Sequence, residues 1–214
     1  TDSKLINLEN IKFVEGKNET SKLFVSTLDI GSDEGAIEKW RDAWSEMHKI
    51  EPEGRFIHSS YASTRPTTQE QIDEYQILEG ASNGASAILI IISILEEDKV
   101  KSFLDLCAEI SISPLVEVFN EKELDIALKY GANIIGINNR NLNNLETSLD
   151  VFEKLAPKVP KDKILIAESG LKNIDDVKRM ADAGADSVLI GESILINNDI
   201  QGHIKQLSSV KKCK

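Results

Sequence analysis

Three nearly identical triplets, each followed by an apolar run, constrain the fold of this 214-residue chain more than any other feature. The triplets are Gly84-Ala85-Ser86, Gly131-Ala132-Asn133 and Gly184-Ala185-Asp186. A helical pattern precedes each one, so the Gly is predicted to end that helix in the left-handed conformation. The Ala and the small polar residue then turn the chain into a strand. The repetition predicts a βα unit that recurs along the chain.

Five apolar runs are the predicted strands of this unit. Apolar residues at successive positions indicate burial on both faces, which is typical of a parallel sheet covered by helices. The runs are Ala87–Ile92, Leu115–Val118, Ile134–Ile137, Ile164–Ala167 and Ser187–Ile190. Helical patterns at 121–130, 148–156, 173–183 and 200–208 follow or separate them, and the stripe of Ile72, Tyr75 and Leu78 predicts a helix that ends near Gly84.

The alternation predicts an α/β fold of the TIM (βα)8-barrel type, as a single domain over residues 1–214. Repeated βα crossovers build either an open doubly wound sheet or a closed barrel. Weaker strand patterns at 11–14, 22–28 and 55–62 raise the strand count to seven or eight, which favours the barrel. The first two of these patterns are too close for a crossover helix, so the N-terminal third, with a helix around Trp40 and Trp44, is predicted to be atypical.

Composition narrows the classes of partner. The formal net charge of −11 argues against nucleic acid or an anionic membrane, although a local pocket can still bind a small anionic substrate. The chain has two cysteines, Cys107 and Cys213, no Cys/His spacing typical of a metal site and no apolar run of 18 residues. We therefore expect a cytoplasmic protein without a bound metal.

Polar side chains lie where the predicted strands end, at the face where TIM barrels place their active sites. They include Glu117, Asn138, Arg140 and Glu168. Burial would raise the pKa of the two Glu side chains and suit them to proton transfer. Each Glu could instead form an ordinary ion pair with a nearby Lys or Arg. The convergence of four such residues on one rim favours a catalytic role.

Two glycine-containing turns end the last two predicted strands, at Glu168-Ser169-Gly170 and at Gly191-Glu192-Ser193. Glycine lets the backbone approach an anion, and amide N–H groups at a helix N-terminus can bind phosphate without a Lys. The alternative is a pair of tight structural turns. Because the two turns are adjacent, we predict a phosphate site between them.

Four motifs within residues 72–199 resemble the indole-3-glycerol phosphate synthase family. In chain order they are Pro114–Leu124, Gly131–Leu142, Ala167–Leu171 and Gly184–Ser193. The resemblance implies a (βα)8 barrel of tryptophan biosynthesis. Such a lyase closes and decarboxylates 1-(2-carboxyphenylamino)-1-deoxyribulose 5-phosphate, a small phosphorylated substrate, without a metal or organic cofactor.

The resemblance also implies roles for individual residues. Glu117 would be the acid–base carboxylate on the fifth strand, and Asn138 and Glu168 would position the substrate and stabilise charge. The remaining implied contacts support the rim and hold the phosphate: Arg140 and Ser169, with the backbone of Gly170, Leu171, Gly191 and Glu192.

The N-terminal third departs from the family pattern. The family's first strand carries Glu-x-Lys before a Ser-Pro-Ser-x-Gly loop, for which Glu15-Gly16-Lys17 is a chance-level echo. Its third strand ends in Lys-Asp-Phe, whose Lys is a general acid, whereas residues 55–66 contain no Lys. Loss of one positioned acid–base group typically lowers a rate by about 10²–10⁴-fold. We therefore expect a weak or impaired synthase.

Two alternatives to a weak synthase stay open. One is a catalytically inactive barrel, chimeric or degenerate, with a junction near residues 68–72, that retains the phosphate-binding site. The other is a small α+β unit at 1–68 beside an incomplete barrel, which would need a second chain to cover its open edge strands. We expect a monomer, or a dimer if the barrel is incomplete.

Overall fold

The computed structural model describes residues 22–24, 73–82, 85, 87–142 and 144–211. The strands predicted at 11–14 and 55–62, the helix around Trp40 and Trp44 and the possible junction near 68–72 lie outside these residues. Gly84 of the first triplet lies outside them as well.

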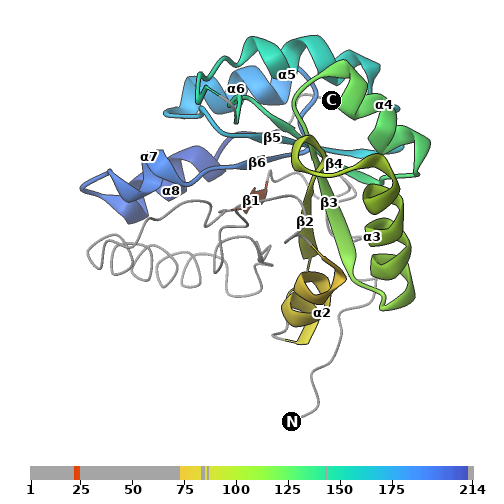
Figure 1. Ribbon diagram of the computed structural model, residues 1–214. Helices are drawn as coiled ribbons and strands as arrows, with labels where there is room; N and C mark the ends of the chain where they lie inside the picture. Colours follow the sequence, from red (N-terminus) through yellow and green to blue (C-terminus); the bar gives the residue numbers. More distant parts are fainter. Residues whose placement is uncertain (1–21, 25–72, 83–84, 86, 143, 212–214) are drawn as a thin grey trace.

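One parallel sheet organises the described residues (Figure 1). In spatial order its six strands are β1 (Lys22–Phe24), β6 (Ser187–Leu189), β5 (Ile164–Glu168), β4 (Ile134–Asn138), β3 (Ser113–Val118) and β2 (Ala87–Ile91). All five pairings are parallel, so the α/β class and the five predicted runs are confirmed. β1 lies within the pattern predicted at 22–28 and pairs with β6, and pairing of the first strand with the last is what closes a TIM barrel.

Helices link consecutive strands and cover one side of the sheet. They are α2 (Glu74–Ser82), α3 (Glu97–Glu109), α4 (Glu121–Lys129), α5 (Asp150–Leu155), α6 (Ile174–Asp182), α7 (Glu192–Leu195) and α8 (Ile200–Ser208), with 3₁₀ turns η4 (Ile92–Ile94) and η5 (Ala156–Lys158). Figure 1 shows α3 to α6 along the outer side of the curved sheet. None of the described helices is long and apolar enough to span a membrane.

At each Gly-Ala triplet, the same type of backbone hydrogen bond ends the preceding helix. Gly131 and Gly184 have φ angles of 77° and 110°, as predicted for left-handed helix ends. The Ala N–H of each triplet donates to the carbonyl five residues earlier, which is the Schellman pattern. These bonds join Ala85 to Gly80 at 3.0 Å, Ala132 to Ala127 at 3.0 Å and Ala185 to Met180 at 2.9 Å.

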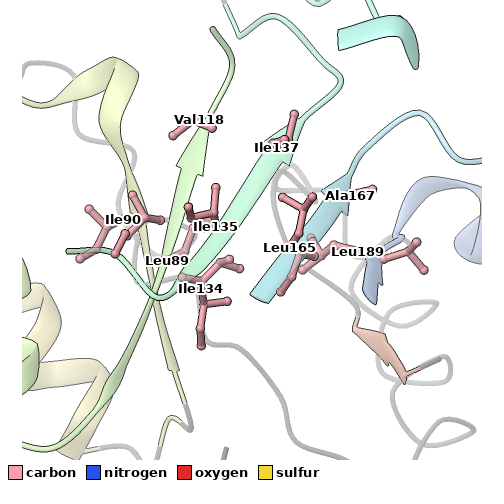
Figure 2. Packing of buried hydrophobic residues seen from close by; sticks show 14 of the residues in the cluster. Leu89, Ile90, Val118, Ile134, Ile135, Ile137, Leu165, Ala167 and Leu189 are labelled. Carbon is pink, nitrogen blue, oxygen red and sulfur yellow. The ribbon is translucent and has the colours of Figure 1, made fainter. Parts of the chain in front are cut away.

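Alternate strand residues divide the sheet into two faces. The face toward the helices is apolar, and Figure 2 shows its members packed together, among them Ile90, Val118, Ile135, Ile137 and Leu165. The opposite face begins with apolar residues such as Leu89 and Leu115. At the carboxyl end of the strands this face becomes polar, because Glu117, Asn138 and Glu168 occupy the next positions.

The apolar stripe predicted for α2 is wrong. Tyr75 is 65% exposed and Leu78 is 44% exposed, whereas Ile77 and Ala81 are buried. Two apolar faces compete on this helix. The small side chain of Ala81 permits close packing, while exposure of Tyr75 leaves its hydroxyl in water.

We expect Gly131→Ala to lower the free energy of unfolding by about 1–2 kcal/mol, because an L side chain resists the left-handed conformation. A Cβ at Gly131 would meet no atom within 4 Å, so the effect is purely conformational. Gly131→Asn should lose less, since Asn tolerates this conformation. Urea unfolding measures both, and equal losses for the two variants would contradict the explanation.

Candidate functional site

Two buried carboxyl groups form the centre of the candidate site. Glu117 near the end of β3 is 2% exposed and Glu168 at the end of β5 is 1% exposed. Both strands pair with β4, on which Gly136 lies opposite Glu117 and Asn138 lies opposite Glu168. A single strand therefore separates the two carboxyl groups, and the predicted convergence of these residues on one rim is what the structure shows.

Gly136 provides the space that brings the two carboxyl groups together. A Cβ atom built on Gly136 would lie only 1.7 Å from Glu168 Oε1. The side chain of Glu168 therefore extends across β4, over the position where any other residue would place its side chain. Since Glu117 is the register partner of Gly136, this direction carries the Glu168 carboxyl toward Glu117.

The amide of Asn138 determines which carboxyl group is ionised. The backbone N–H of Arg140 donates to Asn138 Oδ1 at 2.9 Å, and Asn138 Nδ2 donates to Glu117 Oε1 at 2.9 Å. A backbone N–H can only donate, so the orientation of the amide is fixed. Glu117 must then accept, which favours its carboxylate form.

Burial raises the pKa of Glu117, and the hydrogen bond from Asn138 opposes that rise. Burial also raises the pKa of Glu168, and the negative charge of Glu117 raises it further, to well above its usual value. Glu117 Oε2 and Glu168 Oε1 have no hydrogen-bond partner among the described residues. A proton on Glu168 would supply a donor between two groups that otherwise only accept. Since the pKa of Glu168 is raised more than that of Glu117, Glu168 keeps its proton to higher pH than Glu117 does.

Arg140 lies on the rim, at the start of the loop that follows β4. Its Nη2 donates to Glu192 Oε2 at 2.7 Å, which links this loop to α7. Both side chains are more than a third exposed, so the ion pair contributes little to stability. It does neutralise the carboxylate of Glu192 at the end of the sheet where a phosphate is predicted.

Ser169 and Gly170 form the turn after β5, with φ angles of 63° and 78°. Two successive left-handed residues reverse the chain sharply, and Leu171 then enters the core. The described residues provide no acceptor for the N–H groups of Gly170 and Leu171.

A second turn lies beside the first, where β6 leads into α7. Gly191 is the N-cap of α7 and makes no side-chain capping hydrogen bond. Within the described part of the chain, the N–H groups of Gly191 and Glu192 also lack an acceptor. The N–H of Ser169 donates to the carbonyl of Leu189 at 3.4 Å, which ties the two turns together. Glycine turns with a short helix after the last two strands are the usual setting of phosphate sites in TIM barrels.

Sequence reasoning assigned no role to Asn139, which the structure buries completely. Its Oδ1 accepts from the N–H of Phe152 at 3.2 Å, and its Nδ2 donates to the carbonyl of Ser169 at 3.2 Å. The doublet Asn138-Asn139 is the signal that could have revealed it. Neighbouring residues at a strand end point to opposite faces, so one amide enters the site and the other contacts the helix layer.

Among the described residues, no group of three or more His, Cys, Asp or Glu side chains could hold a metal ion.

Comparison with known proteins identifies the relatives of this chain. A family model described as indole-3-glycerol phosphate synthase matches residues 59–207. The synthase of Caldanaerobacter subterraneus subsp. tengcongensis is 44% identical over 154 residues, which are 71% of this chain and 58% of that protein. The synthase of Chlorobium limicola is 46% identical over 129 residues, which are 60% of this chain and 50% of that protein. That of Methanothermobacter marburgensis is 36% identical over 172 residues, 76% of this chain and 62% of that protein. The chain thus spans little more than half the length of these relatives.

Solved structures resemble the fold at low sequence identity. Mandelate oxidase with benzoyl-formic acid has a TM-score of 0.64 at 12% identity, over 87% of this chain and 70% of that one. Thiamine phosphate pyrophosphorylase from Pyrococcus furiosus has a TM-score of 0.56 at 13% identity, over 96% of this chain and 90% of that one. At such identities the likeness supports the fold alone.

We expect Glu168→Gln to stabilise the protein at neutral and alkaline pH. Because the folded-state pKa of Glu168 is raised, the parent loses stability as pH rises from about 4.3, the unfolded value, through the raised pKa. Gln keeps a donor toward Glu117 and does not ionise, so it avoids this loss. The gain should reach about 1–2 kcal/mol at pH 8 and vanish near pH 4.

Thermal and urea unfolding across this pH range measure the effect. Glu109→Gln, which removes the same charge from an exposed position of α3, serves as the control. A pH-independent gain in Glu168→Gln would mean that titration of Glu168 is not the cause.

Proposed function

Because the chain belongs to the indole-3-glycerol phosphate synthase family, we propose that it converts 1-(2-carboxyphenylamino)-1-deoxyribulose 5-phosphate to indole-3-glycerol phosphate. The observation that carries this proposal is the buried pair of Glu117 and Glu168 at the carboxyl end of a parallel sheet, where the pKa of Glu168 is raised well above its usual value. The reaction would serve tryptophan biosynthesis, as in the family.

The reaction needs both members of this pair. In ring closure, the aromatic carbon that bears the carboxylate attacks the ketone carbon, and the ketone oxygen must gain a proton. Glu168 in its acid form would supply that proton. Loss of CO₂ restores the aromatic ring. Loss of water then requires a proton on the departing hydroxyl, which Glu168 would donate after taking up a proton from solvent. It also requires removal of a proton from the neighbouring carbon, which the Glu117 carboxylate would accept.

Asn138 would keep these two roles apart. Its Nδ2 holds Glu117 as an acceptor, and the N–H of Arg140 holds Asn138 itself. Such preorganised dipoles stabilise developing charge without having to reorient during the reaction.

The substrate phosphate would lie between the turns at Gly170-Leu171 and Gly191-Glu192, beside Ser169. Four backbone N–H groups there have no acceptor among the described residues. Arg140 neutralises the carboxylate of Glu192, which would otherwise repel a phosphate dianion. This arrangement suits a phosphate group and needs no Lys.

We further propose that turnover is slow. The family's lysines on the first and third strands have no counterpart recognised in the sequence, and the corresponding residues lie outside the described part of the chain. The absence of one such group would lower the rate by about 10²–10⁴-fold. The monomeric state and the cytoplasmic location stay predictions from the sequence.

Turnover of the carboxyphenylamino-deoxyribulose phosphate, followed by indole fluorescence, tests the proposal. We expect measurable turnover in the parent and a kcat that is about 10²–10⁴-fold lower in Glu117→Gln, since an amide cannot accept the proton. Glu109→Gln should leave kcat unchanged. No turnover, combined with retained binding of inorganic phosphate, would favour the inactive barrel that keeps only the phosphate site.

Gly136→Ala tests whether the short distance between the two carboxyl groups raises the pKa of Glu168 and supports turnover. The added methyl group would displace the Glu168 carboxyl from its place beside Glu117. The pKa of Glu168 should then fall, because the negative charge that raises it is farther away. We expect a lower kcat and a kcat–pH profile whose loss of activity on the alkaline side moves to lower pH.

Gly131→Ala makes the same chemical change far from the carboxyl groups and serves as the control. A Gly136→Ala profile that coincides with the parent's would show that proximity does not set the pKa of Glu168.

A further inference from the structure

Asn139 is the point where three segments around the phosphate turn meet. Its backbone N–H donates to the carbonyl of Glu168 at 2.8 Å, and its carbonyl accepts from the N–H of Ser148 at 2.9 Å. Its side chain bridges the N–H of Phe152 and the carbonyl of Ser169. Figure 1 shows the strand ends of β4 and β5 and the helix α5 that these bonds connect.

The orientation of the Asn139 amide is forced by its partners. The N–H of Phe152 can only donate and the carbonyl of Ser169 can only accept. The reversed amide would place donor against donor and acceptor against acceptor in a fully buried position. Nδ2 therefore always faces the carbonyl of Ser169.

Holding the carbonyl of Ser169 also sets the direction of a neighbouring N–H. The peptide bond is planar and trans, so the carbonyl of Ser169 and the N–H of Gly170 point in opposite directions within one plane. With the carbonyl directed at Asn139, the N–H of Gly170 points away from it. Only glycine fits at this position, because a Cβ on Gly170 would lie 2.5 Å from Thr147 Cγ2.

We infer that Asn139 is a positioning residue for the substrate phosphate, whose amide holds the Ser169–Gly170 peptide so that the N–H of Gly170 faces the anion. This inference rests on the phosphate site of the proposed function and assigns a cause to its geometry. Asn139 is buried behind the turn and acts through Ser169. Its loss should therefore weaken phosphate binding and raise KM while leaving the proton-transfer chemistry at Glu117 in place.

Asn139→Asp at pH 8 tests the inference. In its ionised form the variant keeps an acceptor for the N–H of Phe152 but faces the carbonyl of Ser169 with an oxygen that has no proton to donate. Asn144→Asp, at an exposed position of the same loop, adds the same charge and is the matched control. The probe is inorganic phosphate, titrated by the rise in Tm that ligand binding produces.

We expect Asn139→Asp to need about tenfold more phosphate for the same rise in Tm and to show a similar increase in KM, with kcat changed less than about threefold. Asn144→Asp should match the parent. If Asn139→Asp does not fold, Asn139→Ala removes the same bond to Ser169 without adding a charge and should show the same direction of change.

Three results would overturn the inference. An unchanged response to phosphate, with or without a change in basal Tm, would reduce Asn139 to a structural residue. A fall in kcat with an unchanged KM would place its effect elsewhere. A parent whose Tm does not respond to phosphate would refute the phosphate site of the proposed function, and the inference with it.

Discussion

The burial of two adjacent carboxyl groups is the constraint on which the arrangement of the carboxyl end of the sheet depends. An isolated buried charge is costly, and two adjacent buried negative charges are more so. The raised pKa of Glu168 favours a proton there, which would relieve this cost, and the Asn138 amide donates to one oxygen of Glu117. Gly136 makes the arrangement possible because it has no side chain. If Glu168→Gln stabilises the folded state as expected, the acid at this position costs stability, as is usual at functional sites.

β4 provides most of the residues that accommodate the two carboxyl groups. Gly136 and Asn138 lie at its carboxyl end and Asn139 directly follows it, and their side-chain positions alternate between the two faces of the sheet. Gly136 and Asn138 lie on the face with the two carboxyl groups, while Asn139 lies on the face toward α5. One short segment therefore organises both the two carboxyl groups proposed to transfer protons and the turn proposed to bind phosphate. The central position of β4 between β3 and β5 gives it contact with both.

The predictable part of this fold rests on local signals. The Gly-Ala triplets end helices through bonds between residues five apart, so the sequence alone reveals them. The strands that follow were predicted to within two residues, and the polar residues at their ends follow from the shared direction of parallel strands. What could not be predicted depends on register and packing. The space at Gly136 is occupied by Glu168 only because β5 pairs with β4 in this register. The turn held by Asn139 joins segments that are distant in the sequence. The buried face of α2 depends on which elements pack against that helix.

The pairing of β1 with β6 has a consequence for how the chain assembles. Strands β2 to β6 each pair with the strand that precedes or follows them in the chain, so each pairing closes a short segment, as between Ala87 and Ser113. The pairing of Lys22 with Ser187 encloses a segment roughly six times longer, which costs about 1.6 kcal/mol more in chain entropy. Contacts of this kind slow folding, because their entropy is lost before their hydrogen bonds form. Among the described strands, β1 and β6 thus form the most non-local pairing, and we expect it to form after β2 to β6 have built the sheet that β1 joins.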